Sequence, residues 1–472
     1  MIKRTVKQIA DMCGGRRKGQ LHNELPVQGV TRDSRELKPG NLFIPIKGER
    51  VDGHDYVAAV LEQGAAASLW QQDLPVPEAV DESRLIFVKD TVAALQKLAA
   101  AYRSELLVRV VGITGSNGKT TTKDMTAAAL GTAYKVHKTS GNYNNEIGLP
   151  LTLLQVDELT EVIVLEMGMS GFGEIELLTK IAQPDAAIIT NIGDSHLLQL
   201  GSREGIAKAK LEIVQGLSEE GIVIYNGDEP LIEAELARIP LASSIRRRTF
   251  GLGEGNDWSA IRISIDSQSS AFTPAYQGVP SELGEIRIPV LGKHNVSNAL
   301  AAIAVARYFG VPGNSIAEGL SGLQLTGMRI EPSAAYNGAV ILNDAYNASA
   351  TSMRAAIDLL EGLEGYRRKW IVLGDILEVG PTEEEAHYSV GEYITPSKAD
   401  AVLTFGPLSE HIYRGARTNF PAEADGTLLM HFEQKEELSE WLRQELQPND
   451  IVLVKGSRGM RMEQVVQALE AR

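Results

Sequence analysis

The stretch from Gly112 to Thr122, GITGSNGKTTT, contains residue types suited to binding the phosphates of a nucleotide. The usual phosphate loop has Gly, four residues, then Gly-Lys-Ser/Thr, and here Ile113 takes the place of the first glycine. The remaining pattern predicts that Lys119 reaches the β- and γ-phosphates of ATP and that the Thr120 hydroxyl binds Mg²⁺. The alternative is a plain turn between a strand and a helix. The residues expected to contact ATP here are Gly115, Ser116, Asn117, Gly118, Lys119, Thr120 and Thr121.

Three further side chains have the chemistry of a metal or phosphoryl-transfer site. Glu166 ends the apolar run EVIVLEMG, and a carboxylate at a strand tip can hold Mg²⁺. His196 follows the run AAIITNIG, and Lys210 lies on the helix after it. Each also has a simpler interpretation, as a solvated carboxylate, a structural histidine or a solvated lysine. Because ligands gather at the carboxyl ends of parallel strands, we expect the three to converge on one pocket with the phosphate loop.

The loop TGSNGKT, with its relaxed first glycine, resembles the phosphate loop of the Mur ligase family. Those enzymes are ATP-dependent amide ligases of three domains that build the peptide of bacterial cell-wall precursors. The resemblance implies that Glu166 and His196 help to bind Mg²⁺, and that Lys210 is carbamylated by CO₂ and stabilises a second Mg²⁺. A carbamate turns a cation into an anion, which suits two metal ions beside ATP. The implied catalytic residues are Lys119, Glu166, His196 and Lys210, and the implied metal ligands are Thr120, Glu166, His196 and carbamylated Lys210.

Two segments resemble the family's binding regions for a UDP-linked muramoyl peptide. In the opening section, TRDSR followed by LFIPIKGERVDGHDY resembles the domain that holds the UDP group, and arginine has a fork suited to phosphate. Charged loop residues without a binding role are the alternative for its second half. SGNYNNEIG supplies amides that donate and accept hydrogen bonds, with an Asn-rich turn as the alternative. The implied substrate-binding residues are Ser34, Arg35, Lys47, Asp52, His54, Asn142, Asn144, Asn145, Thr190 and Asn191.

Motifs later in the chain resemble the family's further ATP contacts, which lie outside the phosphate loop. LGKHNVSNALAAIAVA places Asn295 at a helix start, where it approaches adenine, caps the helix, or does both. TGMRIEP supplies Arg329 and ILNDAYNASATSM supplies Asp344, which the resemblance directs to the ATP phosphates and the ribose. The same string and the closing VLVKGSRGM imply further substrate contacts from Tyr346, Asn347, Lys455, Ser457 and Arg458.

The strings EMGMS and AYNASATSM resemble the family member that adds D-alanyl-D-alanine. The resemblance implies UDP-N-acetylmuramoyl-tripeptide and D-alanyl-D-alanine as substrates, with ATP and two Mg²⁺ ions. In the implied mechanism, ATP first phosphorylates the tripeptide carboxylate, and the dipeptide amine then attacks the acyl phosphate. The third domain is expected to close over the site and exclude water. The alternatives are another Mur-type or folylpolyglutamate-type amino acid ligase, a simple kinase or NTPase, and a nucleotide-gated scaffold.

Composition limits the class of protein. The chain has 472 residues and a formal net charge of −15, which argues against a general nucleic-acid binder. Its one cysteine, Cys13, cannot form an internal disulfide, which favours a reducing cytosol. The N-terminus lacks the apolar core of a signal peptide, and no apolar run approaches the ~18 residues of a membrane span. We therefore expect a cytoplasmic protein with no nucleic-acid partner and no membrane span. We also expect it to be a monomer.

An α/β framework is needed to bring these residues together. Apolar runs alternate with helices along the chain, which predicts βαβ units and mainly parallel sheets. The expected fold is α/β with three domains: a small UDP-substrate domain over residues 1–88, a central P-loop domain over 89–322, and a Rossmann-like domain over 323–472.

Several elements of this framework have recognisable limits. The central strands are expected in VRVVGI, EVIVLEMG, AAIITNIG and GIVIYNGD, and those of the third domain in AVILNDAY, KWIVLGDI, DAVLTFG and DIVLVKG. Residues 258–290 are expected to form an appended, more antiparallel sheet, within which 257–284 is the most loop-like stretch. Helices are expected over residues 91–105, 121–130, 173–181, 203–217 and 295–309.

Overall fold

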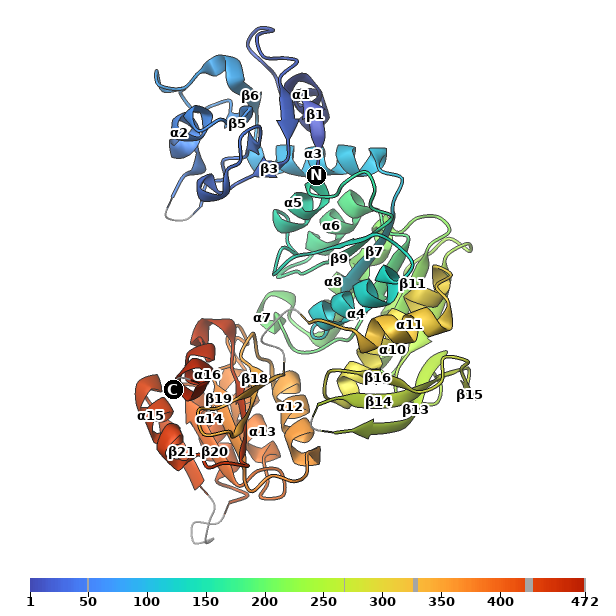
Figure 1. The fold of residues 1–472 in the computed structure, drawn as a ribbon, viewed down its shortest axis with the longest axis vertical. Coiled ribbons are helices and arrows are strands. Elements are labelled where there is room, and N and C mark those ends of the chain that lie inside the picture. Colours follow the sequence, from blue (N-terminus) through green and yellow to red (C-terminus); the bar gives the residue numbers. More distant parts are fainter. Residues whose placement is uncertain (49–50, 267, 326–329, 421–427, 471–472) are drawn as a thin grey trace.

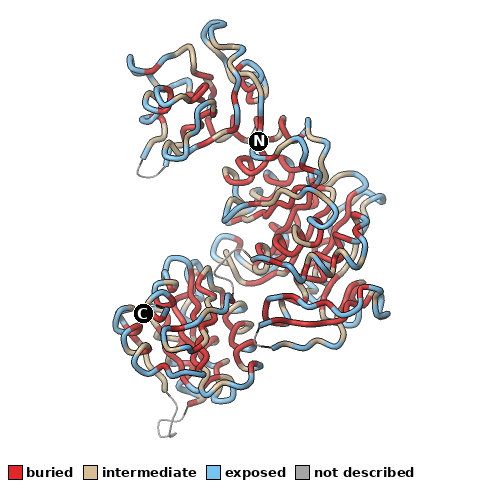
Figure 2. The backbone as a smooth tube through the Cα atoms, viewed as in Figure 1, coloured by how far each residue is buried: buried red, intermediate tan, exposed pale blue. Residues whose placement is uncertain are grey.

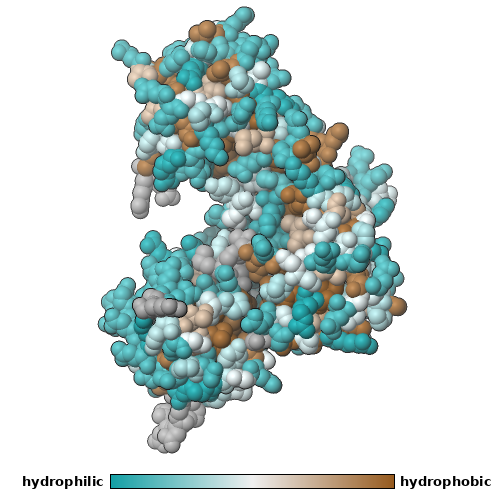
Figure 3. All heavy atoms as spheres, in the orientation of Figure 1, coloured by the Kyte–Doolittle hydropathy of each residue, from teal (hydrophilic) through white to brown (hydrophobic). Residues whose placement is uncertain are grey.

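The computed structural model describes residues 1–472 except 49–50, 267, 326–329, 421–427 and 471–472. Three α/β units follow one another along an open arc, with the first and third at its two ends (Figure 1). The space-filling view shows a largely hydrophilic face, hollowed between those two units (Figure 3). The predicted α/β class with three domains is confirmed, while the exact limits of the domains stay a prediction.

The first unit contains a two-stranded antiparallel sheet, β1-β2, and a small parallel sheet in the order β3-β4-β5-β6. Its first helix begins with a capping box, because the Thr5 side chain accepts from the Gln8 N–H and the Gln8 side chain accepts from the Thr5 N–H. The elements are β1 (Lys3–Thr5), α1 (Val6–Cys13), β2 (Pro26–Gln28), β3 (Val30–Thr31), β4 (Leu42–Phe43), α2 (Val57–Glu62), β5 (Ala67–Gln71) and β6 (Leu85–Val88).

Helix α3 (Thr91–Glu105) occupies the predicted range and joins the first unit to the central one. Asp90 caps the helix by accepting a hydrogen bond from the Ala93 N–H at 2.6 Å. Toward the central unit, the Tyr102 hydroxyl donates to the Val156 carbonyl at 2.8 Å. Apolar side chains of α1, α3 and the central helices belong to one continuous hydrophobic core. The first unit is therefore packed directly onto the central unit.

The central unit is built on a ten-stranded sheet in the order β15-β14-β13-β12-β11-β10-β7-β9-β8, with β16 beside β14. The four runs predicted as strands form the parallel strands β7, β9, β10 and β11. Their almost fully buried side chains are typical of a parallel sheet covered on both faces. The strands are β7 (Arg109–Thr114), β8 (Val136–Lys138), β9 (Val162–Glu166), β10 (Ala186–Ile189), β11 (Ile222–Asn226), β12 (Arg246–Phe250), β13 (Trp258–Ile265), β14 (Ser270–Tyr276), β15 (Val279–Pro280) and β16 (Ile286–Ile288).

The central sheet extends into residues 258–290, which were expected to form an appended, more antiparallel sheet with a loop-like stretch over 257–284. Strands β13 and β14 form an antiparallel pair, and the pairing of Phe250 with Trp258 joins them to the parallel strands. The antiparallel pairing predicted for residues 258–290 is therefore confirmed, whereas the loop-like character predicted for 257–284 is wrong for β13 and β14. The antiparallel section extends the central sheet rather than being appended to it. Serine residues and Pro274 weaken the strand signal in the sequence, whereas cross-strand pairing stabilises the strands in the fold.

Helices cover the faces of the central sheet (Figure 1), and most of the central helix α10 is buried (Figure 2). Helix α4 begins two residues before its predicted start, and the helix predicted over 203–217 divides into α8 and a 3₁₀ turn over Glu212–Gly216. The helices are α4 (Lys119–Gly131), α5 (Gly148–Leu154), α6 (Glu174–Ala182), α7 (Leu197–Leu200), α8 (Arg203–Leu211), α9 (Pro230–Leu236), α10 (Lys293–Tyr308) and α11 (Gly313–Ser321).

The third unit contains a six-stranded sheet in the order β17-β18-β22-β19-β20-β21, with β17 antiparallel to its neighbour and the other pairs parallel. The four runs predicted as strands form β18, β19, β20 and β22. The elements are β17 (Glu331–Ala334), β18 (Val340–Asp344), α12 (Ala350–Gly362), β19 (Lys369–Gly374), α13 (Glu383–Tyr393), β20 (Ala401–Phe405), α14 (Ser409–Ala416), β21 (Leu428–Phe432), α15 (Lys435–Glu445), β22 (Ile451–Lys455) and α16 (Glu463–Glu470). Within the described part of the chain, no helix combines the length and apolar character that a membrane span requires.

Candidate active site

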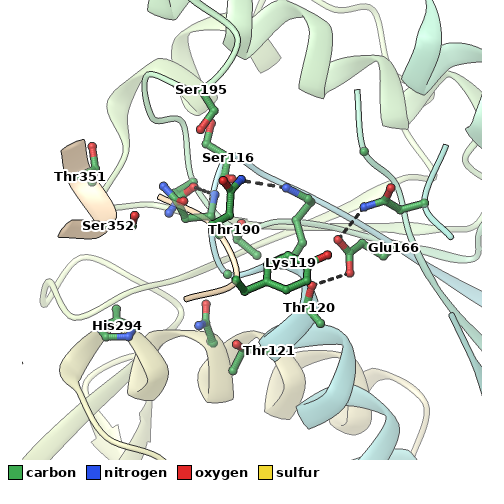
Figure 4. Close-up of a pocket in the computed structure, with 18 of the residues that line it drawn as sticks. Ser116, Lys119, Thr120, Thr121, Glu166, Thr190, Ser195, His294, Thr351 and Ser352 are labelled. Carbon is green, nitrogen blue, oxygen red and sulfur yellow. Dashed lines mark hydrogen bonds between the residues drawn. The ribbon is translucent and has the colours of Figure 1, made fainter. Parts of the chain in front are cut away.

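The phosphate loop connects the end of β7 to the start of α4 (Figure 4). Gly118 occupies the N-cap with φ +80°, and a Cβ there would lie 2.8 Å from Asn298 Oδ1, so that a side chain is disfavoured on both counts. The Lys119 ammonium donates to the Gly115 carbonyl at 2.8 Å, which places the cation over the loop. A helix N-terminus and a lysine at one point favour binding of an anionic phosphate.

Thr190 and Asn191, just beyond β10, hold this loop from the neighbouring strand. The Thr190 hydroxyl donates to the Asn117 carbonyl at 2.6 Å, and Asn191 Oδ1 accepts from the Asn117 N–H at 2.8 Å. The Ser116 hydroxyl in turn accepts from the Gly193 N–H at 2.8 Å. Thr190 and Asn191 were predicted to contact substrate. Both line the cavity described below, but these hydrogen bonds are directed at the phosphate loop.

Replacing Thr190 with valine is expected to raise the KM for ATP about tenfold, because the isosteric side chain leaves the Asn117 carbonyl without a hydrogen bond worth about 1–1.5 kcal/mol. Steady-state kinetics at varied ATP concentration measures the change. Thr126→Val is the matched control, since the buried Thr126 hydroxyl on α4 has no hydrogen-bond partner among the described residues. Equal effects of the two substitutions would contradict the supporting role of Thr190.

Glu166, at the end of β9, faces the start of α4 (Figure 4). Its Oε2 accepts from the Thr120 hydroxyl at 2.8 Å, and its Oε1 accepts from the Asn144 side-chain amide at 2.9 Å. The residue is 3% exposed. A hydroxyl and a carboxylate that share a buried position are the oxygen ligands that Mg²⁺ prefers, so Thr120 and Glu166 fit a magnesium ion.

His196 precedes α7 and has φ +63°, a left-handed conformation that is uncommon outside glycine. Its Nδ1 lies 3.8 Å from Glu378 Oε2 in the third unit and has no hydrogen-bond partner among the described residues. Burial, together with the cations Lys210 and Lys119, lowers the pKa of His196. The ring is therefore neutral at pH 7 and retains a nitrogen lone pair for a metal ion.

Lys210, on α8, is 2% exposed, and its side-chain amine makes no hydrogen bond or ion pair with any other described residue. Burial lowers the pKa of Lys210 well below its ordinary value, and the charge of Lys119 adds to the effect. A lowered pKa leaves more of the amine neutral and nucleophilic at pH 7. Lys208, two residues earlier on the same helix, is exposed instead.

The residues above converge on one cavity of about 850 Å³ between the central and third units. Gly115 lies at the base of the loop, where a Cβ would overlap the Thr190 hydroxyl. Arg329 lies outside the described residues. The predicted site residues that line the cavity are Ser116, Asn117, Gly118, Lys119, Thr120, Thr121, Asn142, Asn144, Asn145, Glu166, Thr190, Asn191, His196, Lys210, Asn295, Asp344, Tyr346, Asn347 and Lys455.

A second cavity of about 560 Å³ continues from the first along the third unit. Two of the residues predicted to contact substrate, Ser457 and Arg458, line this cavity. The residues that border both cavities, and so mark their junction, are Ser116, Lys119, Ser195, His196, Asn347 and Ala348.

Asp344 and Lys455, predicted to contact ribose and substrate separately, form a buried ion pair at the cavity wall. Lys455 Nζ lies 2.6 Å from Asp344 Oδ2 and donates to the Asn347 carbonyl at 2.9 Å, which joins the ends of β18 and β22. Asn295 lies in the first turn of α10, whose N-cap is Gly292. The N-cap alternative for Asn295 is therefore wrong, while its contact with adenine stays a prediction.

Five predicted substrate-binding residues lie in the first unit, outside both cavities: Ser34, Arg35, Lys47, Asp52 and His54. The Arg35 guanidinium pairs with Asp33 at 2.5 Å and its side chain is 86% exposed. His54 is buried, and its Nδ1 lies 2.7 Å from Asp52 Oδ1. These contacts stabilise the first unit itself, and binding of a sugar nucleotide there stays a prediction.

The structure also places residues at the site that the sequence did not single out. Asp228 lines the first cavity at the end of the run GIVIYNGD, so the polar tip of a predicted strand was an available signal. Ser349, the N-cap of α12, approaches Asn117 of the phosphate loop with its Oγ 3.3 Å from Asn117 Nδ2. That contact joins residues 232 positions apart, and no local pattern indicates it.

Three family descriptions match successive parts of the chain: "Mur ligase family, catalytic domain" over residues 26–103, "Mur ligase middle domain" over 113–306, and "Mur ligase, glutamate ligase domain" over 328–458. The chain belongs to the Mur ligase family. A UDP-N-acetylmuramoyl-tripeptide--D-alanyl-D-alanine ligase of Bacillus subtilis (strain 168) is 50% identical over 469 residues, which cover 99% of each chain.

Two solved structures of MurF ligases superpose on nearly the whole chain. MurF from Acinetobacter baumannii superposes with a TM-score of 0.88 at 30% identity and covers 100% of both chains. MurF ligase from Thermotoga maritima in complex with ADP has a TM-score of 0.81 at 29% identity, over 94% of this chain and 97% of that one. The predicted resemblance is confirmed, and this Mur ligase is an ATP-dependent ligase.

Proposed function

We propose that this Mur ligase joins D-alanyl-D-alanine to UDP-N-acetylmuramoyl-tripeptide in the synthesis of peptidoglycan precursors, with ATP converted to ADP and phosphate. The observation that carries the proposal is the convergence of Lys119, Glu166, His196 and Lys210 on one cavity that opens into a second at Lys119 and His196. The full-length similarity to the Bacillus subtilis ligase supports this choice of substrates over a folylpolyglutamate-type reaction.

The two joined cavities suit a reaction in two steps. An oxygen of the tripeptide carboxylate attacks the γ-phosphorus of ATP, ADP leaves, and an acyl phosphate forms. Lys119, which lies over the phosphate loop, neutralises charge on the transferring phosphoryl group. The dipeptide nitrogen then attacks the acyl carbon and loses a proton. The bond from carbon to the phosphate oxygen breaks, and the amide and inorganic phosphate are released.

Two Mg²⁺ ions fit the donor set beside the loop. Thr120, Glu166 and the unpaired Nδ1 of His196 supply ligands, and the unpartnered Lys210 supplies a further anionic ligand once carbamylated. In that modification the neutral Lys210 amine adds to the carbon of CO₂ and releases a proton. When bound, Mg²⁺ neutralises negative charge on ATP and on the attacking carboxylate.

The remaining predicted residues have proposed roles that follow from their positions. Asn295 and Asp344 contact the adenosine of ATP, and Asn142 and Asn145 line the path of the muramoyl peptide. Ser34 and Arg35 bind the UDP group at the far end of the substrate. Because both cavities are lined by one chain, we propose that a monomer is active. We place it in the cytoplasm, where ATP and a reduced Cys13 are both available.

Phosphate release measured with a panel of substrates tests the proposed function. A ligase of this kind releases phosphate when ATP, UDP-N-acetylmuramoyl-tripeptide and D-alanyl-D-alanine are all present, and mass spectrometry detects the pentapeptide product. A simple NTPase releases phosphate with ATP alone. A product formed with a single amino acid, and none with the dipeptide, would instead indicate another Mur-type reaction.

Replacing Glu166 with glutamine is expected to raise the Mg²⁺ concentration needed for half-maximal activity at least tenfold. The substitution keeps the shape of the side chain but removes the charge that binds a divalent cation. Titration of activity with Mg²⁺ at saturating ATP measures the shift. Glu161→Gln, outside both cavities, is the control, and an unchanged Mg²⁺ requirement in Glu166→Gln would rule out the carboxylate as a ligand.

A further inference from the structure

The second cavity contains charged groups that the reaction described above does not use. It meets the first cavity at Lys119 and His196, where the acyl phosphate would form, and extends along α12, α13 and the loop after β19. Arg354 and Ser389 line the second cavity but not the first, and so lie away from this junction. The cavity therefore has a reacting end and a remote end, each with its own polar side chains.

Glu378 lies at the reacting end in a conformation that costs free energy. Its φ of +65° is in the left-handed region, which residues with side chains rarely adopt. The preceding loop is held by a hydrogen bond at 2.8 Å from the Ile376 N–H to Nε2 of the fully buried His387. Its carboxylate lies 3.8 Å from His196 Nδ1 across the gap between the central and third units. A strained backbone held in place by buried contacts indicates a position with a function.

Ser457, predicted to contact substrate, holds the same loop from the other side. Its hydroxyl accepts a hydrogen bond from the Leu377 N–H at 2.9 Å, and its own N–H donates to the Asp375 carbonyl at 3.0 Å. Both bonds are made within the third unit. Ser457 therefore positions the loop that carries Glu378, directly beside the second cavity.

Arg354, on α12, provides a cation with unused hydrogen-bonding capacity at the remote end. Its Nη2 donates to the Ser389 hydroxyl at 2.8 Å, whereas its buried Nε has no hydrogen-bond partner among the described residues. Leaving a buried charged donor unsatisfied is costly, and a carboxylate is the partner that best satisfies a guanidinium. Arg458, in the same cavity, lies 3.3 Å from Glu463 and so already has an acidic partner.

We propose that the second cavity is a two-ended site for a zwitterionic dipeptide, in which Glu378 attracts the ammonium end and Arg354 binds the free α-carboxylate. This assignment rests on the proposed function, because the incoming nucleophile must have an amine at one end and a carboxylate at the other. Its direction follows from the chemistry: the ammonium releases a proton to water, and the neutral amine that results must reach the acyl carbon at the junction. The carboxylate is then left at the remote end. The site therefore selects substrates with a free C-terminal carboxylate.

D-alanyl-D-alaninamide, which lacks the carboxylate charge, tests the role of Arg354. In the unmodified enzyme, kcat/KM for the amide is expected to be about 100-fold lower than for the dipeptide. Arg354→Met should lower kcat/KM for the dipeptide by about the same factor and leave the value for the amide nearly unchanged, which removes the preference. Arg354→Lys should restore part of the preference. Glu378→Gln should lower kcat/KM at least tenfold for both compounds, with the KM for ATP unchanged.

Arg414→Met is the matched control and should keep the preference for the dipeptide, because Arg414 lies on α14, where it pairs with Glu410 and is 57% exposed. Calorimetric titration with ATP confirms that each variant is folded. If the unmodified enzyme forms no product from D-alanyl-D-alanine, the proposed function is overturned. If it does, but Arg354→Met keeps the dipeptide-to-amide ratio, the two-ended site is overturned.

Discussion

Replacing Lys119 with methionine is expected to lower the rate of ATP-dependent amide formation by about 1,000-fold. The lysine is the cation that lies over the phosphate loop, with its ammonium 2.8 Å from the Gly115 carbonyl. Methionine retains most of the side-chain volume but cannot neutralise charge on the transferring phosphoryl group. Phosphate release with all three substrates measures the loss, and calorimetric titration with ATP separates binding from the chemical step.

The control for this substitution is Lys180→Met, on the outer part of α6, where the side chain is 58% exposed and pairs with Glu176. It removes the same charge without touching either cavity and should keep the full rate. A Lys119→Met enzyme that retained more than a tenth of the activity would show that the phosphate loop does not act through its lysine.

Lys210→Met is expected to cause the second large loss, of about 100-fold or more. Burial lowers the pKa of Lys210, so its neutral amine is available to CO₂. The proposed carbamate would add a negative charge beside the proposed Mg²⁺ ions. Methionine supplies no metal ligand. The wild-type enzyme should therefore lose activity after dialysis against CO₂-free buffer and regain it when bicarbonate is added, whereas bicarbonate should not rescue Lys210→Met.

Recovery of activity with bicarbonate should depend on pH, in a direction that follows from the lowered pKa of Lys210. As pH falls through the pKa of Lys210, the amine becomes protonated and no longer reacts with CO₂, so recovery with bicarbonate should fail in acid and succeed above that pKa. Lys208→Met, on the exposed face of the same helix, is the matched control. Full activity of the wild-type enzyme in CO₂-free buffer, with intact-mass spectra that show no CO₂ adduct, would exclude the carbamate.

Features with a local signal were predictable from the sequence. The phosphate loop could be placed because a strand, a glycine-rich loop and a helix start follow one another within a few residues, and α3 begins after the capping residue Asp90. The antiparallel sheet over residues 258–290 was predictable, but β13 and β14 were also described as loop-like because serine residues and Pro274 disfavour strands locally, while the stabilising partners lie in other strands. The pairing of Asp344 with Lys455 joins residues 111 positions apart, and each was therefore assigned a separate ligand.

By itself, the sequence determined the α/β class, the ATP-binding loop and the set of residue types that an ATP-dependent ligase requires, because periodicity and short motifs act over a few neighbouring residues. Only the tertiary structure decided which polar groups meet. Thr190 supports the Asn117 carbonyl from 73 positions away, and Glu378 reaches His196 from another unit. Hydrogen bonds and ion pairs act over about 3–4 Å, and strand order and the packing of the units bring such distant residues within that range.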